Sequence, residues 1–206
     1  MIKITTKNSG FSLVEVLVAI TILLLVIAGP LSIISRSINS TNYATEQVNA
    51  WFLAQEGLEL VQKGRDDLVL ADFKDQLLGQ SLQPDPMTRF LIDYANCLSS
   101  NGCGVTIGNG AAAAVSVKDC GANSSGCQLY LNNILTDRAR YTHTVGPSKT
   151  LFTRVVKIEP SYNTAPTPDR IREMKVTSTV TWRTGSLISS QKVAAVSYLF
   201  NVYDSN

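Results

Sequence analysis

Apolar residues are concentrated in one long run near the start of the chain. Residues 11–34 read FSLVEVLVAITILLLVIAGPLSII and carry a single charge, that of Glu15. About 20 apolar residues span a bilayer as a helix, so the run predicts a transmembrane helix. Gly29 and Pro30 fall inside it, and proline removes a backbone hydrogen bond and disfavours helix at the residue before it. We therefore expect a kink or a locally unwound turn at this point.

An amphipathic pattern follows. Residues 35–64 are compatible with a continuation of the helix, and their apolar positions recur in three- and four-residue steps at Ala44, Val48, Trp51, Ala54, Leu58 and Val61. We expect this stripe to pack on a core, with Trp51 and Phe52 inside it, and the helix to stop near Gly64. A helix over residues 11–63 would be about 80 Å long. A second short helix is predicted after residue 64, broken at residues 84–86, which read PDP.

The last part of the chain alternates as strands do. Residues 152–158 form one strand that ends at Pro160, and residues 193–202 form another. Between them, residues 174–182 place four apolar side chains on one face: Met174, Val176, Val180 and Trp182. We predict an antiparallel meander of three or four strands, with residues 128–131 as a candidate extra strand. The fold class is therefore α+β, a long N-terminal helix whose second half packs on a C-terminal antiparallel sheet.

Four cysteines lie in a segment rich in Gly, Ala, Asn and Ser, which indicates a surface loop over residues 97–127. They are Cys97, Cys103, Cys120 and Cys127. Their spacing lacks the paired C-x-x-C of a zinc ribbon. If the segment is exported, where disulfides persist, two bridges are favoured over free thiols or a metal. Local pairing, Cys97–Cys103 with Cys120–Cys127, is preferred among three connectivities.

The distribution of charge is informative mainly at the N-terminus. The whole chain carries 18 basic and 16 acidic residues, a net charge of +2, which favours neither a nucleic-acid binder nor a trap for acidic substrates. Residues 1–10 contain Lys3 and Lys7 and no acid, so the positive-inside rule predicts a cytoplasmic N-terminus and a head across the membrane. A secretory signal cut near residues 28–29 is the alternative, which Pro30 disfavours.

Residues 10–20, GFSLVEVLVAI, resemble the N-terminal signature of type IV pilin precursors and type II secretion pseudopilins. In that family a short basic leader ends in glycine, a membrane peptidase cuts after it, and the new N-terminal residue is N-methylated. The resemblance implies that residues 1–10 are removed by cleavage between Gly10 and Phe11, that Phe11 is methylated, and that Glu15 serves assembly. It covers only the start of the chain and indicates a class of protein.

Glu15 requires a physical explanation. A carboxylate at a bilayer centre costs about 2.5–3.5 kcal/mol on insertion scales, so an ionisable residue there is a functional hypothesis by default. Cleavage after Gly10 would create an ammonium on Phe11, one helical turn away. In the family this glutamate is thought to meet the N-terminal amine of a neighbouring subunit, so that the two charges compensate in an apolar filament core. The alternative is an interfacial glutamate without a role.

Two functions follow. The first is a structural subunit of a filament, a pseudopilin or minor pilin of a type IV pilus, a type II secretion pseudopilus or a DNA-uptake fimbrium. Its implied partners are the prepilin peptidase/methyltransferase, other pilin or pseudopilin subunits, the inner-membrane assembly platform and the lipid bilayer, with nucleic acid only for DNA uptake. Its head would be periplasmic or extracellular. The second is a single-pass, membrane-anchored binding domain that does not polymerise.

Catalysis is not indicated. No nucleophile, base and orienting group stand out around the one histidine, His143, and no phosphate loop, dinucleotide fingerprint or zinc-protease motif occurs. We predict a protein that is not an enzyme and has no cofactor and no metal. The expected plan is a leader at residues 1–10, a transmembrane and assembly helix at 11–34, an amphipathic continuation at 35–64, and a head at 65–206 that contains the cysteine-bearing loop 97–127.

Overall fold

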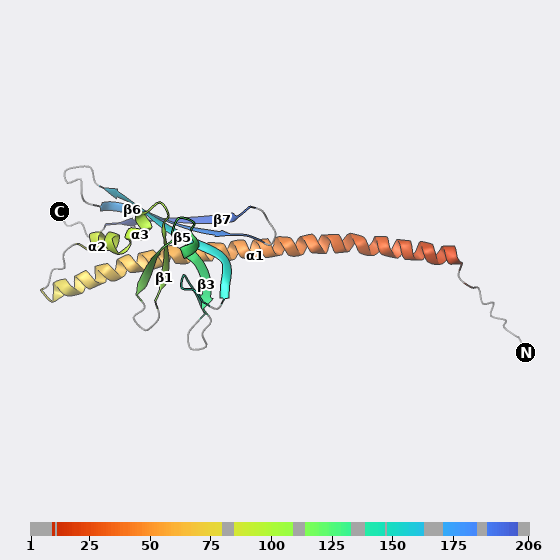
Figure 1. The fold of residues 1–206 in the computed structure, drawn as a ribbon, viewed down its shortest axis with the longest axis horizontal. Coiled ribbons are helices and arrows are strands. Elements are labelled where there is room, and N and C mark those ends of the chain that lie inside the picture. The colour runs from red at the N-terminus through yellow and green to blue at the C-terminus, as the bar shows by residue number, and fades with distance from the viewer. Residues whose placement is uncertain are drawn as a thin grey trace, which may run out of the picture. The chain divides into compact units, whose positions relative to one another are not determined.

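Helix α1 (Leu13–Leu77) is the first element of the computed structural model, shown in Figure 1. The structure describes residues 10, 12–79, 85–108, 114–132, 139–146, 148–162, 171–184 and 189–201. The chain divides into two units, Met1–Thr45 and Glu46–Asn206.

In the first unit, α1 exposes every side chain that the structure describes, from Leu13 to Thr45. The helix continues through Gly29 and Pro30, so the expectation of an unwound turn there is wrong, and a kink stays a prediction. Its hydroxyl groups bond back to the helix itself: Thr21 donates to the carbonyl of Val18 at 2.8 Å. Such internal bonds satisfy polar side chains where no water is at hand.

The predicted helix end near Gly64 is wrong, because α1 runs on to Leu77. Gly64 has a packing role instead: a Cβ on it would overlap the Tyr94 hydroxyl. Two short helices follow, α2 (Pro86–Asp93) and α3 (Ala95–Leu98). Asp85 caps α2 by accepting hydrogen bonds from the backbone N–H groups of Met87 and Thr88. Position 84 of the expected break lies outside the described residues.

In the second unit, the stripe of α1 that is buried differs from the predicted stripe. Trp51 and Phe52 are 44% and 65% exposed, so the prediction that both lie in a core is wrong. The buried positions are mostly small: Ala50, Leu53, Ala54, Gly57, Leu60, Val61 and Gly64. Small residues let a helix backbone approach a sheet closely, and the large side chains at neighbouring positions are then turned outward.

Within the described residues the sheet has seven strands, all paired antiparallel, which confirms the α+β class and exceeds the three or four strands predicted. They are β1 (Cys103–Ile107), β2 (Val115–Asp119), β3 (Gln128–Asn132), β4 (Arg140–Thr142), β5 (Ser148–Tyr162), β6 (Ile171–Trp182) and β7 (Gln191–Phe200). β5, β6 and β7 form the expected meander. β1 and β2 lie in the cysteine-bearing segment, so the prediction of a loop throughout that segment is wrong.

β5 is the central strand of this arrangement. One edge pairs with β6; the other pairs first with β3 and then, at Val156, with Cys103 of β1. The hairpins β1–β2 and β3–β4 therefore extend from different stretches of the same edge. β5 also runs through Pro160, which was expected to end it. Among the described residues, no strand pairs with this edge beyond Val156, so the missing N–H is tolerated there.

Two apolar clusters hold α1 on the sheet. One surrounds Leu60 and Val61, with α2, Tyr94 and the ends of β5 and β6; the other surrounds Ala50, Leu53 and Ala54, with Phe152 and Trp182. The predicted inward face of β6 is confirmed, because all four of its residues are buried: Met174, Val176, Val180 and Trp182. Burying one such side chain stabilises the fold by roughly 1.5–3 kcal/mol.

Between the two clusters lies a polar contact. Arg154 on β5 is fully buried and donates to the Glu56 carboxylate at 2.7 Å, to the Leu53 carbonyl at 3.0 Å and to the Val105 carbonyl at 2.7 Å. Gly57 makes room for it, since a Cβ there would lie 3.1 Å from the Cδ of Arg154 and would overlap the Ser178 hydroxyl. A buried guanidinium must be paired, and here the pairing ties α1 to β5 and β1.

Candidate functional site

Gly10 is exposed, and a Cβ built on it would meet no atom within 4 Å. Packing within the described part of the chain therefore gives no reason for glycine at this position. Phe11, the predicted site of methylation, lies outside the described residues, and so do residues 1–9 with Lys3 and Lys7.

Glu15 lies in the first turn of α1, where the partial positive charge of the helix N-terminus favours a carboxylate. The side chain is exposed and, within the described ranges, has no hydrogen-bond or ion-pair partner. The next charged residue along the helix is Arg36, so 20 uncharged positions separate the two. Among the described residues, Glu15 is thus the one charged side chain in the apolar stretch of α1 before Arg36.

The apolar part of α1 can serve as a membrane anchor. Among the described helices, α1 alone is long and apolar enough to cross a bilayer. Its apolar side chains find no cover inside the first unit: Leu13 is 77% exposed and Leu25 is 75% exposed. Exposed apolar surface on this scale marks a membrane or an interaction site.

Both disulfides are local and lie in the head. Cys97 is bonded to Cys103, and Cys120 to Cys127, the pairing that the sequence favoured among three. The first bond joins α3 to the start of β1, and the second closes the turn between β2 and β3. All four sulfurs are buried.

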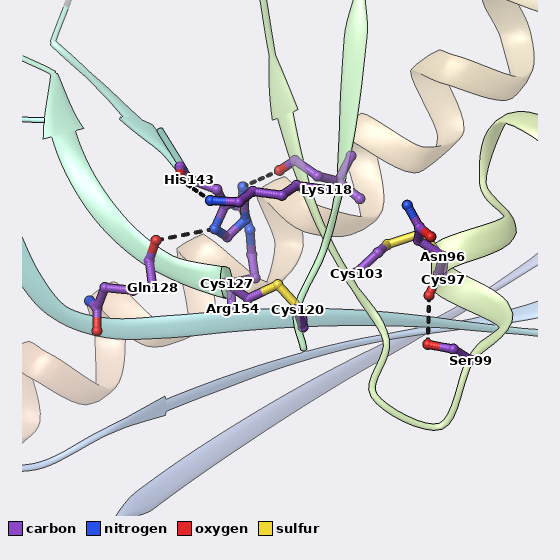
Figure 2. The surroundings of a disulfide bond; sticks show 11 residues. Asn96, Cys97, Ser99, Cys103, Lys118, Cys120, Cys127, Gln128, His143 and Arg154 are labelled. Atoms are coloured by element: carbon purple, nitrogen blue, oxygen red, sulfur yellow. Dashed lines mark hydrogen bonds between the residues drawn. A yellow bond between two sulfur atoms is a disulfide. The ribbon is translucent and has the colours of Figure 1, made fainter. Parts of the chain in front are cut away.

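A second group of polar residues surrounds the Cys120–Cys127 bridge (Figure 2). His143, which follows β4, is 2% exposed, and its ring lies where a Cβ of Gly104 would be. Its Nδ1 is 3.3 Å from the Gln128 carbonyl, so that nitrogen carries the proton, and Nε2 has no partner among the described residues. Lys118 donates to the His143 carbonyl at 3.2 Å.

The surroundings keep this histidine neutral. Burial, then the charge of Arg154, then that of Lys118 lower the pKa of His143 from 6.5 to about 4. Burial also lowers the pKa of Arg154, and Glu56 opposes that effect. The hydrogen bonds of His143 join β2 and β3 to the turn after β4, which is a structural contribution. Sequence reasoning missed this group of residues, although strict alternation from Phe152 to Ile158 already places Arg154 on the buried face.

A pocket of about 340 Å³ lies between α1 and β4. It is lined by Asn49, Phe52, Leu53, Glu56, Ala139, Arg140 and Tyr141. Its volume is at the lower end of small-molecule sites, and its one carboxylate is already engaged by Arg154. Within the described ranges, no three His, Cys, Asp or Glu side chains come together as metal ligands would. Neither feature points to a ligand.

The comparison with known families identifies the N-terminal segment. Residues 5–29 match the family model described as the prokaryotic N-terminal methylation motif, while no curated protein and no solved structure matches the chain. The motif indicates a structural subunit, and the apolar helix that follows is compatible with a single-pass anchor. The resemblance noted in the sequence is thereby confirmed: the chain carries the N-terminal methylation motif that is the hallmark of type IV pilin and pseudopilin precursors.

Proposed function

We propose that the chain is a structural subunit of a type IV pilus-like filament, a pseudopilin or minor pilin, that polymerises through α1. The observation that carries this proposal is Glu15, which has no partner among the described residues and is the one charge in the apolar stretch of α1 before Arg36. A binding domain that only needed an anchor would gain nothing from a carboxylate there. A subunit that packs its helix against others needs a charge that can select a partner.

Cleavage between Gly10 and Phe11 supplies the partner charge. The new α-ammonium of Phe11 would stand four residues before Glu15 along the chain. In a bundle of such helices, the ammonium of one subunit would meet the Glu15 carboxylate of the next. Opposite charges removed from water are stable only when they are paired, so the contact would also fix the register between neighbouring helices.

The leader controls this step in the proposal. Before cleavage, the two lysines of the leader would favour the cytoplasmic side of the membrane and hold the start of the helix there. After cleavage and methylation of Phe11, the helix can leave the bilayer sideways into the filament. Gly10 fits a peptidase requirement, because packing within the described residues does not demand a glycine and the lack of a side chain lets a protease hold the backbone closely.

The head completes the proposal. Two disulfides suit a domain exported across the membrane, where the surroundings are oxidising. The proposed partners are the prepilin peptidase/methyltransferase, other subunits of the filament and the inner-membrane assembly platform.

Two measurements test the proposal. Mass spectrometry of the mature protein is expected to find a methylated N-terminal Phe11; a start after Ala28 or an intact Met1 would contradict it. Glu15→Gln keeps the shape of the side chain and removes its charge. It should be processed normally, yet filament yield should fall at least about tenfold, equal to about 1.4 kcal/mol per contact.

Ser12→Ala, a neighbouring change that removes no charge, is the matched control and should assemble like the wild type. The membrane-anchored binding domain is the competing function. If Glu15→Gln assembles as well as the wild type does, the filament proposal fails and the membrane-anchored binding domain is favoured.

A further inference from the structure

The sheet has a long open edge at β7, which pairs only with β6 among the described residues. Native proteins generally blunt such edges, because a row of unpaired N–H and C=O groups is a template for another strand. The other open edges of this sheet are blunted. β2 has five residues and ends in Lys118 and Asp119, β4 has three residues, and the unpaired part of β5 contains Lys157, Glu159 and Pro160.

β7 has none of these protections over most of its length. It is ten residues long, reads QKVAAVSYLF, and contains no proline and no acid. Its one charge, Lys192, is at the beginning, so eight uncharged residues follow. A strand of this length and composition is an unusual edge for a protein that has blunted its others.

The hydrogen bonds show which backbone groups are free. The Asn201 N–H donates to the Arg172 carbonyl at 3.0 Å, and residues alternate along an antiparallel ladder. The N–H and C=O groups of odd-numbered β7 residues therefore point to β6, and those of even-numbered residues point to the open edge. The Phe200 carbonyl agrees with this, since it accepts a hydrogen bond from Arg65, on α1, rather than from β6.

The same even-numbered residues carry the exposed side chains. Val196 is 48% exposed, Tyr198 is 53% exposed and Phe200 is 54% exposed. The residues whose backbone groups point to the open edge thus also carry exposed apolar side chains on one face of the sheet. Main-chain groups at strand spacing are matched only by another extended polypeptide, and alternate apolar side chains would give that segment its register.

We propose that β7 is an assembly edge: an extended, uncharged segment of a neighbouring filament subunit adds to it as an eighth strand, with an acidic residue at the end that meets Lys192. This inference rests on the proposed function, because a filament holds heads close together and so raises the effective concentration of strands beside β7. Side-by-side β addition then supplements the contacts between helices.

Hydrogen exchange tests the inference on the full chain, with the detergent-solubilised protein compared with filaments assembled from it. In the solubilised protein the amides of Ala194, Val196 and Tyr198 should exchange fast while those of the odd-numbered residues are protected. In filaments the three amides should slow by at least about tenfold. Filaments in which they still exchange fast overturn the inference alone. If no filament forms, the proposed function fails and the inference falls with it.

A charge placed on the edge provides the second test. Val196→Lys adds a blunting lysine to the open edge, while Thr177→Lys, the matched control, adds one at the paired position on central β6. Val196→Lys should abolish the slowing of the Ala194 and Tyr198 amides and lower filament yield; Thr177→Lys should do neither. Equal behaviour of the two variants contradicts the inference. Equal melting temperatures of the solubilised variants and wild type serve as the folding control.

Discussion

Acidification should destabilise the head through His143. The folded head holds this side chain neutral, with a pKa of about 4 against 6.5 in an unfolded chain. Two positive groups, Arg154 and Lys118, act on it, and its free Nε2 has no acceptor among the described residues for a second proton. Protonation would add a third positive charge to a buried space, and the Glu56 carboxylate is already paired with Arg154.

The sign follows from proton binding. Between pH 6.5 and pH 4 the unfolded chain binds a proton at His143 and the folded chain does not. The stabilisation is therefore complete above pH 6.5 and falls as the pH drops towards 4. One pKa unit is worth 1.36 kcal/mol, so a shift from 6.5 to about 4 corresponds to a loss of about 3 kcal/mol. That is a large part of the stability of an ordinary domain.

The assay is urea unfolding of the full chain in a mild detergent at pH 7, 5.5 and 4, followed by tryptophan fluorescence, to which the buried Trp182 contributes. Carboxylates also titrate at low pH, so the informative quantity is the difference between the wild type and His143→Gln. The variant cannot take up the proton and should lack the extra loss of about 3 kcal/mol.

The single histidine also permits a direct measurement. His143 is the only one in the chain, so an imidazole-specific NMR label reports its pKa without assignment. A folded pKa at or above 6.5 would refute the reasoning. So would wild type and His143→Gln losing the same free energy of unfolding from pH 7 to pH 4, since the loss would then come from other groups.

Two further predictions concern packing and the disulfides. Gly57→Ala should destabilise the head by about 1–3 kcal/mol, measured by urea unfolding, because its Cβ would overlap the Ser178 hydroxyl. Gly29→Ala, where a Cβ meets nothing within 4 Å, is the control and should be neutral or stabilising; a loss as large as that of Gly57→Ala would contradict the packing argument. Replacing both Cys120 and Cys127 by Ala should lower the melting temperature through a loss of about 2–3 kcal/mol, and an unchanged melting temperature would show that the bridge contributes nothing.

The periodic parts of the fold could be predicted from the sequence. Strict alternation along β6 fixed its inward face, because a two-residue period leaves only two choices and one of them is polar. The apolar run gave the start of α1, since few other structures accommodate so many uncharged residues. The motif at residues 10–15 could likewise be recognised from the local sequence alone.

Other parts could not be predicted because they depend on contacts between distant segments. Gly64 has the composition of a helix stop, yet its role is set by Tyr94, thirty positions away, which fills the space that a side chain would take. The exposed Trp51 follows from small residues on the neighbouring face, which bring α1 close to the sheet. β1 and β2 escape detection because five-residue strands between glycines carry too little pattern.

The disulfides have a mechanical consequence. Each closes a short stretch of chain inside the head, and neither reaches α1. A pull on α1 is therefore resisted at the sheet by side-chain packing and by the Arg154–Glu56 pair, without a covalent cross-link. Formation of the two disulfides stabilises the β-sheet side of the head but adds no covalent link between the sheet and α1. Under tension we expect α1 to separate from the sheet, beginning at Ala50 and proceeding towards Gly64, while both disulfides stay intact.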